Sequence, residues 1–253
     1  MTSRPIYLCM YGHFYQPPRE NPWLEEIEEQ SSAAPYHDWN ERIHDECYLP
    51  NTRARVLDAH GKIVDMVNNF EKISFNYGPT LISWLANKYP GTYRLIVEGD
   101  RRSVKTHRHG NALAQAYNHM IMPLANQRDK VTQVRWGLAD FRKRFGREPE
   151  AMWLPETACD EPTLDVLIQE GMKFAILEPQ QAEAVRKFEG DDWHDVSAGQ
   201  IDPKRPYRFF SRTEPGRFID IFFYDGPISK AIGFEDVLTD AKRLMGRIEM
   251  AKV

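Results

Sequence analysis

Four ionisable side chains each stand directly after an apolar run that could form a β-strand: His13, Glu156, Glu178 and Asp225. In parallel α/β folds the carboxyl ends of the strands meet at one edge, and active sites lie at that edge. We therefore expect one histidine and three carboxylates at a common rim. Carboxylates that converge in a cleft suit the cleavage of glycosidic bonds, in which one acts as nucleophile or base and another as proton donor.

Each of these side chains also has a purely structural interpretation. Glu156 could be a first-turn carboxylate favoured by the dipole of the following helix, and that dipole would keep it ionised, as a nucleophile requires. Asp225 precedes Gly226-Pro227, and Asp-Gly is first of all a turn signal. Glu178 precedes Pro179 and has less support still. His13 at a strand end is better placed for function than a typical core histidine.

Other kinds of chemistry find little support in the sequence. His107, His109 and His119 match no zinc spacing, and the basic side chains around the first two would repel a cation. There is no GxSxG elbow, phosphate-binding loop or dinucleotide fingerprint. We therefore expect no metal and no cofactor. Aromatic side chains near the candidates could stack on sugars, and Trp153 and Tyr77 are among them.

The hydrophobic pattern predicts an α/β fold, because short apolar runs alternate with stretches of helical spacing. A parallel sheet is expected, either open or closed into a barrel. The long segment from Gln16 to Pro50 has no sustained periodicity and is expected to form a lid or rim. Predicted strands span residues 6–11, 73–76, 151–154, 174–177, 207–210 and 218–223, and predicted helices span 56–67, 131–145, 160–168 and 234–248.

The composition sets limits on the class of protein and on its partners. With 253 residues, 42% hydrophobic and 28% charged, the chain suits one soluble α/β domain over residues 1–253. A net charge of -4 gives no reason to expect nucleic acid or a membrane as a partner. The three cysteines are far apart in sequence, and the first residues do not resemble a secretion signal. A cytoplasmic location is therefore expected.

Several segments resemble the motifs of glycoside hydrolase family 57, in order and over most of residues 5–230. Gly12-His13-Phe14-Tyr15-Gln16-Pro17 is similar to the first motif, with Tyr15 in place of a second histidine. The strongest likeness is that of Met152-Trp153-Leu154-Pro155-Glu156-Thr157-Ala158 to the motif that carries the nucleophile. Two further segments are similar to family regions, namely 75–81 around Gly78 and 118–124, which contains His119 and Pro123.

The resemblance implies a distorted (β/α)7-type barrel and retaining chemistry on α-glucans or oligosaccharides, by hydrolysis or by glucanosyl transfer, without a required metal. Glu156 would be the nucleophile, His13 would hydrogen-bond the sugar in the first subsite and Trp153 would shape that subsite. The other expected substrate-binding residues are Gln16, Tyr77, His119 and Glu178.

The sequence departs from the family pattern at the proton donor. The donor aspartate usually lies in an Asp-Gly-Glu segment, whereas Asp225-Gly226-Pro227 lacks the glutamate. We therefore expect the barrel to be incomplete in this chain, the donor to lie beyond Val253 or to be Asp225, and the isolated chain to self-associate and to be poorly active. Two alternatives stay open, which are a non-catalytic carbohydrate-binding or regulatory barrel and a metal-dependent polysaccharide deacetylase.

Overall fold

The computed structural model describes residues 7–189 and 192–251 and divides the chain into two compact units. The first unit comprises Met1–Met120 and Val131–Met152, and the second comprises Ile121–Lys130 and Trp153–Val253. That the whole chain is one domain stays a prediction.

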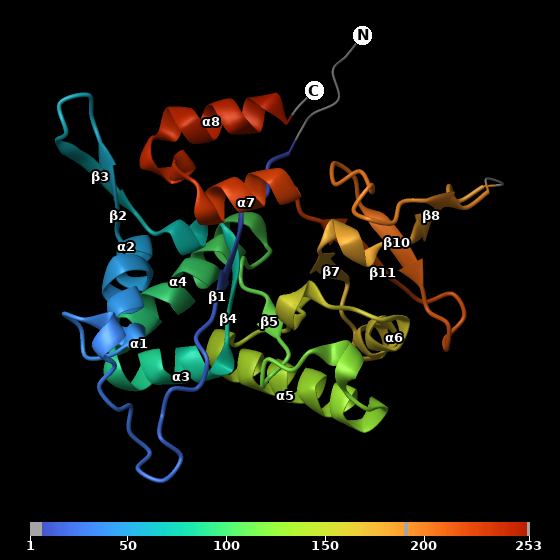
Figure 1. Cartoon of the computed structure of the whole chain (residues 1–253), viewed down its shortest axis with the longest axis horizontal. Coiled ribbons are helices and arrows are strands. Elements are labelled where there is room, and N and C mark those ends of the chain that lie inside the picture. Colours follow the sequence, from blue (N-terminus) through green and yellow to red (C-terminus); the bar gives the residue numbers. More distant parts are fainter. Residues whose placement is uncertain (1–6, 190–191, 252–253) are drawn as a thin grey trace. The chain divides into compact units, whose positions relative to one another are not determined.

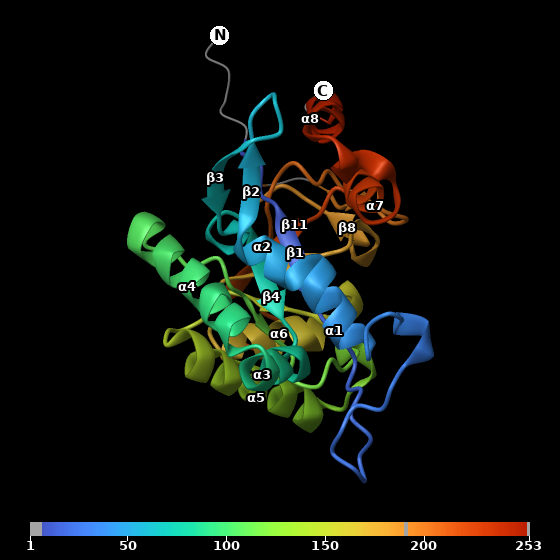
Figure 2. The ribbon, with the colours of Figure 1, turned by 90° about the vertical axis from the view of Figure 1, so that its left-hand side faces the viewer.

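The first unit is built on two parallel strands, β1 (Tyr11–Phe14) and β4 (Ser74–Tyr77), in which His13 is opposite Asn76. Helices α3 (Pro79–Lys88), α4 (Pro90–His107) and most of α5 (Gln127–Phe145) pack around this pair (Figures 1 and 2). The core holds Phe75, Leu85 and Ile96, which have no exposed surface.

Shorter elements complete the first unit. Strand β5 (Ala114–Gln115) pairs with β6 (Met152–Trp153), whose Met152 is the last residue of this unit, and the Ala114 amide donates to the Ala151 carbonyl at 3.0 Å. The others are η1 (Ser31–Ala33), α1 (Trp39–Ile43), the π-helix η2 (His44–Tyr48), α2 (Leu49–Thr52), β2 (Ala54–Leu57), β3 (Ile63–Val67) and η3 (Asn69–Glu71).

The second unit contains a three-stranded sheet in the order β10 (Tyr207–Phe210), β11 (Phe218–Phe223) and β7 (Phe174–Leu177). Strand β11 is antiparallel to β10 and parallel to β7. The other elements are η4 (Met122–Leu124), η5 (Pro155–Thr157), α6 (Glu161–Gln169), η6 (Pro179–Gln181), β8 (Ala184–Val185), β9 (His194–Asp195), α7 (Gly226–Phe234), η7 (Asp236–Thr239) and α8 (Ala241–Met250).

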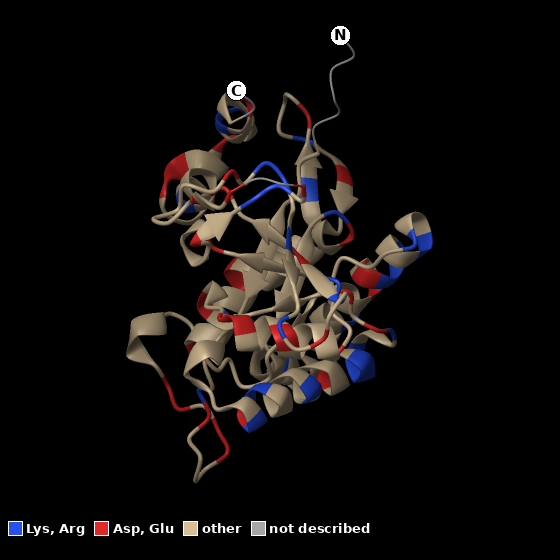
Figure 3. Ribbon diagram, turned by 90° about the vertical axis from the view of Figure 1, so that its right-hand side faces the viewer, with Lys and Arg blue, Asp and Glu red and all other residues tan. Residues whose placement is uncertain are grey.

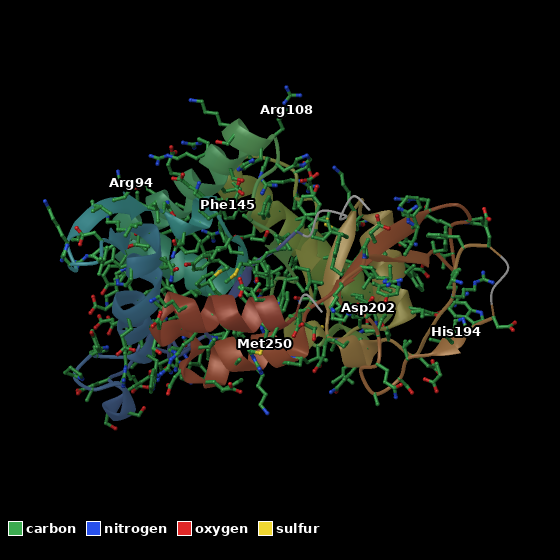
Figure 4. The ribbon with its side chains drawn as sticks, turned by 90° about the horizontal axis from the view of Figure 1, so that it is seen from above. Arg94, Arg108, Phe145, His194, Asp202 and Met250 are labelled. Atoms are coloured by element: carbon green, nitrogen blue, oxygen red, sulfur yellow. The ribbon has the colours of Figure 1, made fainter. Side chains whose placement is uncertain are left out.

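Most of the expected elements are confirmed. Helix α5 ends at Phe145, which Figure 4 labels, and Gly146 follows with a φ of 67° that a helix cannot continue. Basic positions outnumber acidic ones along α5 (Figure 3). Helix α6 begins after Asp160, whose side chain caps it, and β7, β10 and β11 match their predicted ranges.

The predicted helix over residues 56–67 is wrong, because this segment forms the β2–β3 hairpin. The Asp58 Oδ1 atom accepts hydrogen bonds from the amides of His60 and Lys62 at 2.8 and 2.9 Å, and Gly61 has a φ of 77°. These features close a turn in the middle of the expected helix. Figures 1 and 2 both show the hairpin projecting beyond α2, the helix that β2 follows in the chain.

Three other ranges need correction. The first strand lies at Tyr11–Phe14 instead of 6–11; Tyr7 is 87% exposed, and Ile6 lies outside the described residues. The expected loop from Gln16 to Pro50 contains α1 and η2 and the start of α2. The expected last helix is interrupted between Phe234 and Ala241, because Asp240 is extended and caps a new helix, α8.

The α/β class is confirmed, but the described strands form one three-stranded sheet and four two-stranded pairs, with no closed barrel among them. Within the described part of the chain, no helix combines the length and the apolar character needed to cross a bilayer.

Candidate functional site

In the first unit, the exposed His13 is hydrogen-bonded to a network that extends to the buried Asn76 and Gln115. Because β1 and β4 are in parallel register, the His13 Nδ1 atom lies 3.0 Å from the Oδ1 atom of Asn76. The same oxygen accepts a hydrogen bond from the Tyr11 hydroxyl, and the Asn76 amide nitrogen donates to Gln115 Oε1. Since Oδ1 can only accept, the Nδ1 atom of His13 donates to it, and in the neutral ring Nε2 is then the acceptor nitrogen.

Three rings stack beside this network. The rings of Tyr15 and His119 are 3.7 Å apart and nearly parallel, and His13 stacks with His119 at 5.6 Å. The two histidine Nε2 atoms are 3.5 Å apart. A Cβ atom on Gly78 would come within 2.7 Å of the Tyr15 ring, so glycine is needed there. Tyr15, which replaces the expected second histidine, is therefore part of the stack.

The other candidates of this unit are placed differently. Gln16 lies between Tyr48, whose hydroxyl is 3.4 Å from its amide nitrogen, and Arg19, which donates to its oxygen at 2.6 Å. Tyr77 is only 6% exposed and stacks on Phe14 at 4.8 Å, so it belongs to the core. Burial raises the pKa of Tyr77 well above its ordinary value.

The histidines considered as metal ligands are not gathered. His109 pairs with Glu150 at 2.8 Å, whereas His119 lies in the stack with Tyr15. Among the described residues, no group of three or more His, Cys, Asp or Glu side chains has a metal-binding arrangement.

In the second unit, Glu156 stands exposed on a strained turn. It lies in the short η5 helix with a φ of 54°, and Thr157, which is 5% exposed, follows with a φ of 53°. A left-handed conformation is uncommon for residues other than glycine, and each such residue costs about 1–3 kcal/mol of conformational free energy. The Thr157 amide donates to Leu154 O at 2.9 Å and holds this turn. Trp153, three residues before Glu156, is 8% exposed.

A tyrosine that sequence reasoning missed joins two of the candidate segments. Leu177 is in register with Phe223 on the parallel strands β7 and β11, so Glu178 and Tyr224 leave the sheet at the same edge. Glu178 and Thr157 both influence the pKa of Tyr224, which places their side chains near its hydroxyl. Burial, and then the charge of Glu178, raises the pKa of Tyr224, which keeps its hydroxyl protonated as a donor. Its position after an apolar strand was the available signal.

Asp225 follows directly and caps helix α7. Its Oδ1 atom accepts a hydrogen bond from the Ile228 amide at 2.9 Å, which agrees with the turn interpretation of Asp-Gly. A role for Asp225 in proton donation stays a prediction.

An ion pair between a buried lysine and a partly exposed aspartate supports the chain that follows Glu156. Lys130, 4% exposed, donates to both carboxylate oxygens of Asp160 at 2.8 and 2.7 Å and to Thr163 Oγ1 at 3.1 Å. Burial raises the pKa of Asp160, but the hydrogen bonds from Lys130 and Thr163 outweigh it and lower that pKa below its usual value. Burial raises the pKa of the neighbouring Cys159 to about 12, so this thiol is not a nucleophile.

The structure therefore groups His13 with Tyr15 and His119 in the first unit, and Glu156 and Thr157 with Tyr224 and Glu178 in the second. Both groups include side chains at or near the ends of strands in an α/β fold. These side chains can bind polar substrates or, in the case of a carboxylate, attack them. The chain belongs to glycosyl hydrolase family 57, whose family model matches residues 11–252.

Solved structures with a similar fold include the 4-α-glucanotransferase from Thermococcus litoralis, with a TM-score of 0.60 and 16% identity over 95% of this chain and 31% of that chain. An exo-type maltose-forming amylase from Pyrococcus sp. ST04 gives a TM-score of 0.58 and 14% identity, with 89% and 36% of the two chains covered. The branching enzyme of Thermococcus kodakaraensis, solved in complex with glucose and additives, gives a TM-score of 0.54 and 14% identity. The match covers 93% of this chain and 49% of that chain.

This chain thus spans about a third to a half of the length of these three proteins. No match was found among curated protein sequences.

Proposed function

We propose that the chain is the part of a retaining α-glucan hydrolase or glucanotransferase that carries the nucleophile, Glu156. The observation that carries the proposal is the strained, left-handed placement of Glu156, whose exposed side chain is followed by the buried Thr157. Strained non-glycine residues cluster at active sites because the surrounding structure maintains them for function. Family membership and the similarity to three α-glucan enzymes support the same chemistry.

In the proposed reaction, the Glu156 carboxylate attacks the anomeric carbon and forms a covalent glycosyl-enzyme, while an acid protonates the leaving oxygen. Water or a sugar hydroxyl then displaces the glycosyl group. The His13 Nε2 atom would accept a hydrogen bond from a sugar hydroxyl, and Trp153 would shape the first subsite. Asp225 is the candidate donor in this chain; since its Oδ1 atom caps α7, Oδ2 would carry the proton.

The test is trapping of the covalent intermediate. The chain is incubated with a 2-deoxy-2-fluoro glycosyl fluoride of an α-linked maltooligosaccharide, digested, and searched by mass spectrometry for a glycosylated peptide. We expect the label on Glu156 and its loss in Glu156→Gln. Glu25→Gln is the matched control, because Glu25 is also a glutamate with a left-handed φ, of 56°. Labelling that persists in Glu156→Gln would contradict the assignment.

A non-catalytic carbohydrate-binding role is the second candidate, favoured by Tyr15 in the ring stack where the family usually has histidine. Calorimetric titration with maltooligosaccharides beside a reducing-sugar assay separates the two, since this candidate requires binding without turnover. Stoichiometric zinc, cobalt or nickel in elemental analysis would instead favour a metal-dependent deacetylase.

A further inference from the structure

An open pocket of about 580 Å³ lies in the first unit, lined by residues of the segment before α1, of α1, η2 and α2, and of the α3–α4 junction. In Figure 1, α1 lies beside α3, and Lys88 at the end of α3 forms an ion pair with Glu41 of α1. The volume falls in the range of about 300–1,000 Å³ that is typical of small-molecule sites. None of its lining residues belongs to the candidate site described above.

His44, one of the residues that line the pocket, is held by close contacts. His44 is 5% exposed, stacks on Tyr89 at 3.7 Å with an angle of 15° between the rings, and lies 2.9 Å from the Thr92 hydroxyl through its Nε2 atom. It begins the single π-helical turn η2, a feature that often marks functional sites. Burial lowers the pKa of His44, against the opposing effect of nearby carboxylates, and so favours the neutral ring.

The pocket offers hydrogen-bond acceptors and donors together. Glu41 and Asp45 supply carboxylate oxygens, and the Tyr36 hydroxyl donates to Asp45 at 2.6 Å. Lys88, in contrast, supplies a hydrogen-bond donor, its ammonium group. The first turn of α4, which includes Gly91, has no side-chain cap, and its amides have no acceptor within the helix.

This mixture selects the kind of ligand. Two carboxylates repel an anion, whereas an ammonium group and the positive end of the α4 dipole repel a cation. A neutral ligand that is rich in hydroxyl groups can donate to Glu41 and Asp45 and accept from Lys88 and from the amides of the α4 first turn. The half-buried rings of Tyr36 and Tyr89 add the apolar surface on which sugar rings pack.

We propose that this pocket is a second saccharide-binding site, which holds a glucosyl segment of an α-glucan with residues other than Glu156 and His13. The choice of α-glucan rests on the proposed function, whereas the preference for a neutral polyhydroxylated ligand rests on the pocket itself. The site would raise the affinity for long glucans by holding one chain at two places.

The experiment is a titration of the isotope-labelled full chain with maltoheptaose, followed by backbone amide and histidine ring NMR signals. Gly91→Trp blocks the pocket, since a Cβ on Gly91 meets no atom within 4 Å and its φ is not left-handed. Gly233→Trp in α7 is the matched control, because a Cβ there also meets no atom within 4 Å. Asp45→Ala is a milder second variant that removes one acceptor.

We expect saturable shifts at Tyr89–Thr92 and at His44 that are lost in Gly91→Trp, weakened at least threefold in affinity in Asp45→Ala, and retained in Gly233→Trp. Shifts confined to the surroundings of Glu156 and His13 would overturn the inference and leave the proposed function standing. Pocket shifts without any near Glu156 would support the inference and count against the proposed function. Pocket shifts produced by sodium phosphate or ethylammonium, but not by maltoheptaose, would also overturn it, as would the absence of any response.

Discussion

The ion pair between Lys130 and Asp160 allows a sharp test of how the second unit holds its candidate nucleophile. In Asp160→Asn the side-chain oxygen can still accept from the Thr163 amide, at 3.0 Å in the wild type, so the cap of α6 is kept. What is lost is the charge opposite Lys130, which is 4% exposed. A buried charge without its partner costs about 3–5 kcal/mol, so we expect the free energy of unfolding to fall by this amount.

Replacement of Lys130 instead of Asp160 should cost less stability. In Lys130→Met, Asp160 keeps its bonds to Thr163, and a third of its side chain is exposed, so water can solvate the carboxylate. We expect a loss of about 1–2 kcal/mol. The double variant should recover part of the Asp160→Asn loss, because no lone buried charge remains. Urea unfolding at pH 7 measures the free energy of unfolding of the two single variants and of the double variant. Equal losses in the two single variants, or the opposite order, would refute the assignment of the desolvation penalty to Lys130.

The contribution of the pair also depends on pH. The pKa of Asp160 is lower in the folded chain than its usual value near 3.9, so the native state binds fewer protons than the unfolded state in the acid range. The stabilisation is complete above pH ~5 and is lost as the pH falls through the lowered folded pKa. The difference in unfolding free energy between the wild type and Asp160→Asn should therefore stay constant from pH 7 to pH ~5 and shrink below that. A difference that grows towards acid pH would contradict this account.

Four further outcomes are expected. Glu156→Gly should raise the free energy of unfolding by about 1 kcal/mol in urea titrations while removing activity, because glycine adopts a φ of 54° without strain, whereas Glu25→Gly should leave activity unchanged. Tyr224→Phe should lower kcat more than tenfold with little change in the melting temperature; an unchanged kcat would remove Tyr224 from the site. Cys159 in the native chain should resist iodoacetamide at pH 8 and react after unfolding, since burial raises its pKa to about 12. Phe234→Lys, at a side chain that is 88% exposed, should reduce self-association in light scattering if exposed apolar groups drive it.

Sequence periodicity predicted the elements whose local signals agree with their packing. Helix α5 has apolar residues at helical spacing and ends at a glycine, and β7 and β11 are apolar runs that pair in parallel. The hairpin at 54–67 was missed because Val56, Ile63 and Val67 fit a helical spacing by coincidence, while the turn depends on hydrogen bonds to the Asp58 side chain. Amphipathic spacing over so short a stretch does not separate a helix from two strands.

The same reasoning explains why part of the candidate site was found and part was missed. Ionisable residues after apolar runs are visible in a sequence, so His13, Glu156 and Glu178 could be named. Tyr224 also follows an apolar run, but it was passed over because its role depends on the pairing of β7 with β11, which joins residues nearly fifty positions apart. The partner of His13 depends likewise on the register between β1 and β4, which sets Asn76 opposite it.

The conformation of Glu156 was beyond sequence reasoning for a different reason. Pro155-Glu156-Thr157 contains no glycine, so nothing in it indicates two successive left-handed residues, and a threonine is among the side chains least suited to one. A chain selected for stability alone would be expected to have glycine at the first of these positions. Local preference is thus violated at the one glutamate that also matches the nucleophile motif, and such violations are expected where function, and not folding, determines the residue.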